Sequence, residues 1–267
     1  MASGTDHIAA AFKAADGRAA LMPYMMGGFP NLKASTAIGL ACADAGADVI
    51  ELGVPFSDPL ADGPVIHAAG TRALATGATL HGVLDVAARL SERVPVVLMC
   101  YANLLYARGV QRFAHELAAT GAGGLIVPDL PLEEAVGVRA ACDAAGLALV
   151  PLIAPTTPED RLTAIVEQAR GFVYAVSVTG TTGERAGLEG ALAQLLARAK
   201  AHSPVPVAVG FGISTPDQAA GAAAAGADGV IVGSRLVRAA TEAADAGADP
   251  AAAVGELVAA LAAGLRR

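Results

Sequence analysis

The chain has 267 residues, of which 54% are hydrophobic, and it carries a formal net charge of −7, so nothing indicates a nucleic-acid surface. Its Ala-rich tracts are interrupted by Asp, Glu or Arg, and its start lacks the basic and apolar regions of a secretion signal, so neither a membrane span nor a signal peptide is expected. Three scattered cysteines (Cys42, Cys100 and Cys142) show no metal or redox spacing, which favours a reduced, cytoplasmic protein.

Short apolar runs alternate with alanine-rich stretches along the whole chain. At 44–53, 119–129 and 224–234, and more weakly at 143–153, a glycine-containing turn ends a helical pattern and leads into an apolar run. Such runs are typical of strands covered on both faces in a parallel sheet. Strands are predicted near 20–26, 47–52, 94–100, 123–127, 147–152, 172–177, 205–209 and 228–232. Helices are predicted over about 5–15, 31–45, 64–91, 109–119, 131–145, 158–169, 189–202, 214–225, 233–246 and 250–265.

Eight successive strand-then-helix units predict a single (β/α)8 TIM barrel over residues 1–267, with an extra N-terminal helix and a C-terminal helix. A doubly wound open sheet is the alternative, but no GxGxxG motif follows the first predicted strand. No linker or change of composition divides the chain. In a TIM barrel the chemistry lies where strands end and the following loops begin.

Residues 51–64, "ELGVPFSDPLADGP", place an acid at such a strand end and two more in a stiff loop. Glu51, among apolar neighbours, is expected to be desolvated and to keep its proton more readily than a free glutamate. Asp62 could stay ionised, and two acids that differ in protonation are a recurring acid/base arrangement. The alternative for Glu51 is a side chain that leaves the barrel into solvent. Asp58 precedes Pro59, which favours a turn or cap role.

Glycines follow the last two predicted strands. Gly210 and Gly212 lie after the seventh, and Gly233 and Ser234 after the eighth. Bare amides on such loops, together with helix N-termini, form an anion site without lysine, and this is the usual phosphate position in the fold. A phosphorylated substrate is therefore predicted, although Ser234 could also be a plain N-cap.

Elimination narrows the chemistry further. The three lysines (Lys13, Lys33 and Lys200) lie on predicted helices or their flanks, which argues against a Schiff base, and the five histidines do not gather at strand ends, which argues against a His-ligated metal. Carboxylate acid–base chemistry on a phosphate ester remains. Asp129, in "VPDLP", fits a site role or an N-cap before Pro131 equally well.

Seven motifs in this order carry a family resemblance: "MPYMMGGFP" (22–30), "ELGVPFSDPLADGP" (51–64), "CYANLLYARG" (100–109), "VPDLP" (127–131), "YAVSVTGTTGERAG" (174–187), "GFGIS" (210–214) and "GADGVIVGSRLV" (226–237). With them the chain resembles tryptophan synthase α subunits over nearly its whole length. It departs from the pattern at Pro128 and at the start of the 177–190 segment.

The resemblance implies a retro-aldol cleavage of indole-3-glycerol phosphate to indole and glyceraldehyde 3-phosphate. It assigns the acid/base role to Glu51 and the hydrogen bond from the indole N–H to Asp62, with no metal. It also implies an α2β2 heterotetramer in which a β subunit, the holder of pyridoxal phosphate, converts the indole to tryptophan; this chain itself is expected to need no cofactor. Rival functions are a stand-alone lyase that releases indole, a non-catalytic regulatory subunit and another phosphate-sugar barrel.

The resemblance also transfers pocket residues by matching letters. These are Tyr101, Asp129 and Tyr174 as lining residues, Thr182 as a contact of the second catalytic loop, Phe211 between the phosphate glycines, and Gly183, Gly212, Gly233 and Ser234 as phosphate contacts. Residues 177–190 are expected to form a mobile lid with a trypsin site at Arg185. The partner surface is expected at 53–64, 102–109 and 131–134.

Overall fold

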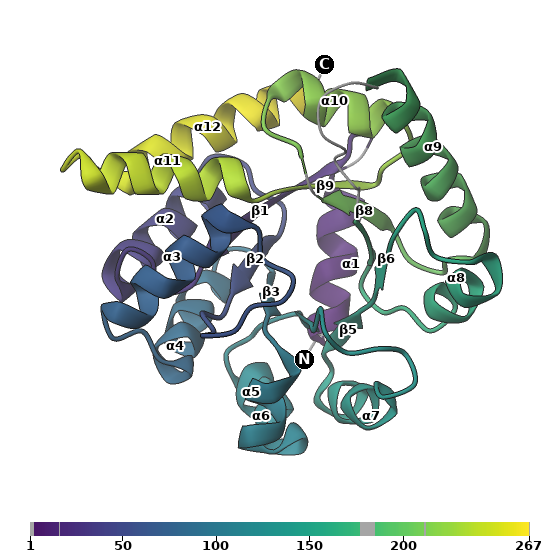
Figure 1. The fold of residues 1–267 in the computed structure, drawn as a ribbon, viewed down its shortest axis with the longest axis horizontal. Coiled ribbons are helices and arrows are strands. Elements are labelled where there is room, and N and C mark those ends of the chain that lie inside the picture. Colours follow the sequence, from purple (N-terminus) through teal and green to yellow (C-terminus); the bar gives the residue numbers. More distant parts are fainter. Residues whose placement is uncertain (1–2, 16, 177–184, 211, 267) are drawn as a thin grey trace.

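One sheet of parallel strands forms the centre of the molecule (Figure 1). The structure is a computed structural model, and it describes residues 3–15, 17–176, 185–210 and 212–266. In these residues nine strands pair in the order β5-β4-β3-β2-β1-β9-β8-β7-β6. Their bounds are β1 Ala20–Met26, β2 Ile50–Gly53, β3 Val96–Met99, β4 Gly124–Ile126, β5 Ala148–Val150, β6 Leu152–Ile153, β7 Val173–Val176, β8 Val207–Gly210 and β9 Gly229–Val232.

The two ends of that order, β5 and β6, are halves of one interrupted strand. Only Pro151 separates them, and proline has no N–H to continue a ladder. β5 pairs with β4, β6 pairs with β7, and the Tyr174 amide donates to the Pro151 carbonyl at 2.9 Å. The sheet therefore forms a nearly closed barrel in which β5 and β6 together count as one of eight strands. This confirms the predicted (β/α)8 fold.

Helices surround this barrel. Their bounds are α1 Gly4–Ala14, α2 Leu32–Asp44, α3 Pro64–Ala75, α4 Leu80–Ser91, α5 Ala102–Arg108, α6 Val110–Ala119, α7 Val136–Ala145, α8 Glu159–Val166, α9 Arg185–His202, α10 Pro216–Ala224, α11 Ser234–Asp245 and α12 Pro250–Leu265. None of them, over the described ranges, is long and apolar enough to cross a membrane.

Two predictions of the number of helices in a stretch differ from the structure, and the helix predicted at 131–145 begins only at Val136. The stretch 64–91 holds two helices, because Gly77 turns with a φ of +86° and Thr79 caps α4 by accepting from the Gly82 amide. The short helix α5 was missed, because Gly109, also at a φ of +86°, separates it from α6 after only seven residues. Both breaks occur at glycines in left-handed conformation, which an alanine-rich pattern does not reveal.

Helix α1 covers the end of the barrel where the strands begin, and it is seen through the ring of strands in Figure 1. Its Ile8 is fully buried, and its Phe12 ring lies 5.8 Å from the Phe172 ring. At the same end Asp48 accepts two hydrogen bonds from Arg18 and one from the Leu21 amide. These contacts tie the starts of β1 and β2 together, away from the strand ends where the chemistry is expected.

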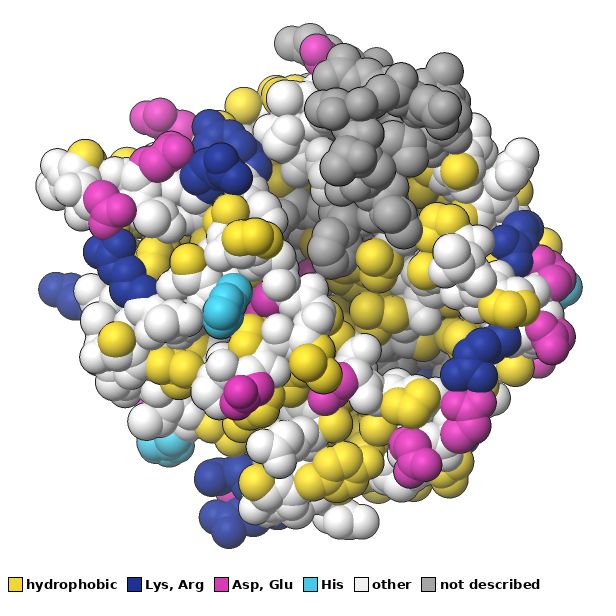
Figure 2. Space-filling view, in the orientation of Figure 1, with side chains coloured by type: hydrophobic (Ala, Val, Ile, Leu, Met, Phe, Trp, Pro, Cys, Tyr) yellow, Lys and Arg dark blue, Asp and Glu magenta, His cyan; other side chains and the backbone are white. Residues whose placement is uncertain are grey.

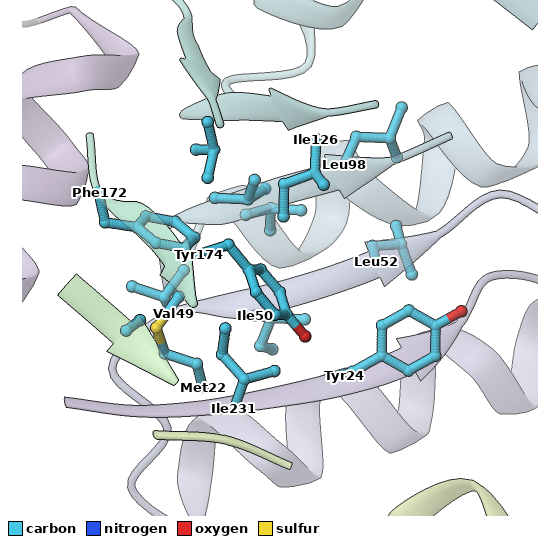
Figure 3. Close-up of a cluster of buried hydrophobic side chains, with 14 of the residues drawn as sticks. Met22, Tyr24, Val49, Ile50, Leu52, Leu98, Ile126, Phe172, Tyr174 and Ile231 are labelled. Carbon is cyan, nitrogen blue, oxygen red and sulfur yellow. The ribbon is translucent and has the colours of Figure 1, made fainter. Parts of the chain in front are cut away.

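Buried apolar side chains from all around the barrel fill its core. Figure 3 labels Met22, Tyr24, Val49, Ile50, Leu52, Leu98, Ile126, Phe172, Tyr174 and Ile231 in one such cluster. Among the described residues the buried polar or charged side chains are Ser35 and Glu51. Ser35 accepts a hydrogen bond from the Gly28 amide at 3.1 Å, so its polarity is matched. The two carboxyl oxygens of Glu51 have no such partner among the described residues, and neither does the buried Ser91 hydroxyl.

Candidate active site

Glu51 lies on the wall of a cavity of about 630 Å³ at the end of the barrel where the strands finish. The lining comes from β1, β2, β3, β7 and β9 and from the loops that follow several strands. It consists of Tyr24, Glu51, Ala61, Asp62, Gly63, Ile66, Met99, Tyr174, Gly212, Ile213, Ser214, Ile231, Gly233, Ser234, Arg235, Arg238 and Glu242. The cavity thus brings both acids together with both predicted phosphate loops.

Size alone does not select this cavity. Hollows of about 950 Å³ near Lys13 and about 700 Å³ between α2 and α4 are larger. Neither is lined by a buried charged residue, since Glu51 is the buried charged side chain of the described chain. A cavity that holds a buried titratable group among apolar walls is the better candidate for catalysis.

Glu51 lies on β2, between β1 and β3. It pairs in register with Tyr24 on β1 and Val97 on β3 and is 1% exposed. Neither carboxyl oxygen has a hydrogen-bond partner among the described residues. Burial, and then the charge of Asp62, raise the pKa of Glu51 to about 8. The expected desolvation is confirmed, and the carboxyl group is mostly protonated at neutral pH.

Asp62 is placed by a tyrosine from the next strand end. The Tyr101 hydroxyl donates to Asp62 Oδ1 at 3.1 Å and accepts from the Ala61 amide at 3.0 Å. Burial raises the pKa of Asp62 above its usual value, and the Tyr101 hydrogen bond and the charge of His67 offset only part of that rise. The two acids therefore have different environments, one without hydrogen bonds and one hydrogen-bonded. Tyr101, predicted as a lining residue, is not part of the cavity wall itself, and it meets the wall through its hydrogen bond to Asp62.

Two buried tyrosines complete the floor of the cavity. A Cβ atom at Gly53 would lie 2.2 Å from the Tyr24 hydroxyl, and one at Gly210 would lie 2.3 Å from the Tyr174 hydroxyl. The glycines therefore give the phenol groups their space. Burial is the main cause that keeps the pKa of both tyrosines well above its usual value, so both stay protonated. Nearby charge adds to this effect, from Asp62 and then Glu51 for Tyr24 and from Glu51 for Tyr174. Tyr174 was predicted from the sequence, whereas Tyr24 was not, although its register opposite Glu51 would have revealed it.

The predicted phosphate end lies at the start of α11. Gly233 precedes the helix and Ser234 is its first residue. First-turn amides of a helix lack partners within the helix and favour an anion. Gly212 has a φ of +78°, a backbone conformation that glycine adopts without strain. Of the other predicted contacts, Thr182, Gly183 and Phe211 lie outside the described residues, as do residues 177–184 of the expected lid.

Asp129 lies apart from these groups. Its carboxylate accepts a hydrogen bond from the Ala102 amide, at the first residue of α5, with a distance of 2.9 Å. It lines a separate cavity of about 420 Å³ together with Pro128 and Arg161. Asp58 is exposed and accepts a hydrogen bond from the Ser57 hydroxyl at 2.5 Å, and it does not line the cavity of Glu51.

The structure adds two arginines that the sequence did not point to, Arg235 and Arg238, both on the cavity wall. The three lysines are all helical, in α1, α2 and α9. In the described part of the chain, no three His, Cys, Asp or Glu side chains converge where they could hold a metal ion. The groups that face the cavity are thus carboxyls, phenols, backbone amides and guanidinium groups.

Comparisons with known proteins give matches over nearly the whole chain. The family described as "Tryptophan synthase alpha chain" matches residues 10–265. The tryptophan synthase alpha chains of Prochlorococcus marinus (strain MIT 9313) and Synechococcus sp. (strain CC9902) are each 51% identical, over 84% of this chain and 82% and 84% of their own lengths. A tryptophan synthase structure from Mycobacterium tuberculosis superposes with a TM-score of 0.89 at 41% identity, covering 100% of both chains. Tryptophan synthase subunit alpha from Legionella pneumophila superposes with a TM-score of 0.90 at 36% identity, covering 100% of this chain and 99% of its own.

Proposed function

The chain belongs to the tryptophan synthase alpha chain family, whose reaction cleaves indole-3-glycerol phosphate to indole and glyceraldehyde 3-phosphate, and we propose that Glu51 and Asp62 carry out this cleavage without a metal ion. One observation carries the proposal. Glu51 is a buried carboxyl group without a hydrogen bond to any described residue, and it faces the same cavity as a hydrogen-bonded aspartate.

The first step is proton donation by Glu51. Burial holds this carboxyl in its protonated form at neutral pH. It gives its proton to the indole ring carbon that bears the glycerol chain, which turns the ring into a cationic indolenine. Asp62, favoured as a carboxylate by the Tyr101 hydroxyl, accepts the N–H hydrogen bond and stabilises the positive charge.

The second step returns a proton to Glu51. Its carboxylate removes the proton from the hydroxyl group on the carbon attached to the ring. The C–C bond breaks, its electron pair neutralises the ring, and the hydroxyl becomes the aldehyde of glyceraldehyde 3-phosphate. Glu51 regains the proton that it gave, so one group serves as acid and then as base.

The phosphate group binds at the other end of the cavity. The first-turn amides of α11, at Ser234 and the residue after it, and the loop at Gly212 supply hydrogen-bond donors. Thr182, Gly183 and Phe211 would add to this end by their resemblance to family positions. Asp129 is proposed as a pocket residue on resemblance alone, since it faces the neighbouring cavity.

Direct assay of the purified chain tests the acid and base roles. Glu51→Gln and Asp62→Asn should each lower the rate of glyceraldehyde 3-phosphate formation about 100-fold or more. Glu92→Gln and Asp85→Asn, which make the same changes on the exposed face of α4, should leave the rate unchanged. A Glu51→Gln enzyme with near-normal turnover would exclude the mechanism, as would a rate that a metal chelator abolishes.

The indole product is proposed to pass to a β subunit that holds pyridoxal phosphate, within a cytoplasmic α2β2 heterotetramer. Large apolar side chains near the expected docking segments support this: Leu60 is 85% exposed and Tyr106 is 53% exposed. Such side chains are common in protein interfaces. Indole release measured with and without the β subunit tests the proposal. The β subunit is expected to accelerate indole release strongly for the wild-type chain and less for Leu60→Ser. An isolated chain that is fully active and does not respond to the β subunit would indicate a stand-alone lyase.

A further inference from the structure

One face of α11 carries charge into the cavity. Arg235, Arg238 and Glu242 all line it, and their spacing of three and four residues places them on one side of the helix. Arg235 is half-buried and Arg238 is exposed. Figure 2 shows a dark-blue group of Lys or Arg side chains over α11. The cavity wall that begins at the predicted phosphate end is therefore basic.

These two arginines have no partner within the described residues, neither a hydrogen bond nor an ion pair. Several arginines elsewhere on the surface are engaged, such as Arg18 with Asp48 at 2.6 Å and Arg161 with Glu133 at 2.6 Å. A half-buried guanidinium group without an acceptor is costly unless a ligand supplies one. Arg235 is therefore a hydrogen-bond donor that is available to an anionic ligand.

The acids of the cavity do not supply that anion. The charged groups close enough to affect the pKa of Asp62 include His67 but neither arginine, and the pKa of Glu51 responds to Asp62 alone among charged groups. Glu242 makes no ion pair within 4.0 Å with any described residue, and at 1.5 Å of rise per residue it lies about 10 Å further along the helix than Arg235. No charge from the part of the chain that the structure describes thus compensates the arginines at the start of α11.

The position of Arg235 matches that of a phosphate ligand. It directly follows Ser234, at the helix end whose free amides and dipole already favour an anion. A phosphate monoester is largely a dianion at neutral pH, and a planar guanidinium group binds two of its oxygens at once. Backbone amides and Arg235 can therefore act on the same group from one helical turn.

We propose that Arg235 is a direct ligand of the substrate phosphate, and that Arg238, one turn further along α11, adds a weaker, solvent-screened attraction. This inference rests on the proposed function. It changes the character of the phosphate end, because binding then depends on a side-chain charge and not on backbone amides alone. It also makes substrate binding sensitive to ionic strength, which screens exposed charges.

Binding of two matched ligands tests the role of Arg235. The first is 3-(indol-3-yl)propyl phosphate, which keeps the ring and the phosphate but lacks the hydroxyl groups needed for cleavage; the second is the corresponding alcohol. Arg235→Met keeps the length of the side chain and removes its charge. It should raise the Kd of the phosphate ligand about 10-fold or more and leave that of the alcohol unchanged. Arg235→Lys should restore part of the loss.

Arg238→Met should raise the Kd of the phosphate ligand only about twofold at low salt, as for an exposed charge. Arg89→Met on α4, an exposed arginine without a partner among the described residues, removes the same charge far from the cavity and should change neither Kd. In turnover assays Arg235→Met should raise KM and leave kcat nearly unchanged, since phosphate contacts act equally on substrate and transition state.

Three outcomes separate this inference from the proposal beneath it. If Arg235→Met binds the phosphate ligand as tightly as the wild type, Arg235 is not its ligand, and the phosphate end still stands on its amides. If Arg235→Met loses both ligands equally, its role is structural and the inference also fails. If the wild-type chain does not prefer the phosphate ligand over the alcohol, the phosphate end of the proposed function is itself wrong.

Discussion

Burial of Glu51 should cost the protein stability, and Glu51→Gln removes that cost. The pKa of this carboxyl is about 8 in the folded chain against an ordinary value of 4.5. Between these values the folded state binds a proton that the unfolded state has released, so the free energy of unfolding falls as pH rises through this window. Below pH 4.5 both states are protonated and the cost is absent; above about pH 8 it is complete.

The size of the effect follows from the same two values. Each pKa unit corresponds to about 1.4 kcal/mol. pH 7 lies about 2.5 units above the ordinary pKa, so at this pH the buried carboxyl lowers the free energy of unfolding by about 3 kcal/mol. Above pH 8 the loss of stability reaches about 5 kcal/mol. Glutamine does not titrate, so the variant should be more stable than the wild type by amounts that grow in this way, relative to their difference near pH 4.

Denaturant unfolding of both proteins at several pH values between 4 and 9 measures this difference. Glu92→Gln, which removes an exposed carboxyl at the end of α4, is the control and should give a difference that is constant over this range. A pH-independent difference between wild type and Glu51→Gln would refute the reasoning, because it would mean that the buried carboxyl titrates as it does in the unfolded chain.

Three further predictions concern the site and its support. Tyr101→Phe removes the donor to Asp62 and should lower kcat/KM for cleavage about 5- to 10-fold in steady-state assays, and an unchanged value would separate the tyrosine from catalysis. Asp48→Asn weakens the two-point contact with Arg18 and should lower the free energy of unfolding by about 1–3 kcal/mol in denaturant titrations while cleavage at low temperature is retained; an unchanged stability would contradict it. The wild-type kcat/KM should fall as pH rises through about 8, because the protonated form of Glu51 starts the reaction, and a rate that increases through this pH would contradict that order of steps.

The barrel was predictable because its signal is carried by sequence-local patterns. The predicted strand 20–26 coincides with β1, and the regular succession of apolar runs gave the eight units. Glu51 could be identified for a related reason, because an acid directly after an apolar run is unusual. It was predicted to end its strand, whereas the structure has it as the second of the four residues of β2, still on the cavity wall. The exact ends of helices were harder, since alanine fits a helix, a turn and a loop.

The cavity wall could not be read in full, because it depends on contacts between distant segments. Tyr24 and Arg235 look like ordinary strand and helix residues until the closed barrel places them beside Glu51 and the first turn of α11. Asp129 shows the converse. Its position after a strand suits a site residue, yet its carboxylate accepts from the Ala102 amide, a contact that no local pattern announces.

Proton exchange at the indole ring tests the role of Glu51 most directly, because it observes proton donation without C–C cleavage. The chain is mixed with indole and the unreactive glycerol 3-phosphate in heavy water, and proton NMR follows the ring hydrogen at the carbon to which the glycerol chain would be attached. If Glu51 gives and takes this proton, the wild-type chain should accelerate its replacement by deuterium, and Glu51→Gln should lower that acceleration about 100-fold or more. Exchange that proceeds equally fast with Glu51→Gln would contradict the assignment of Glu51 as the proton donor.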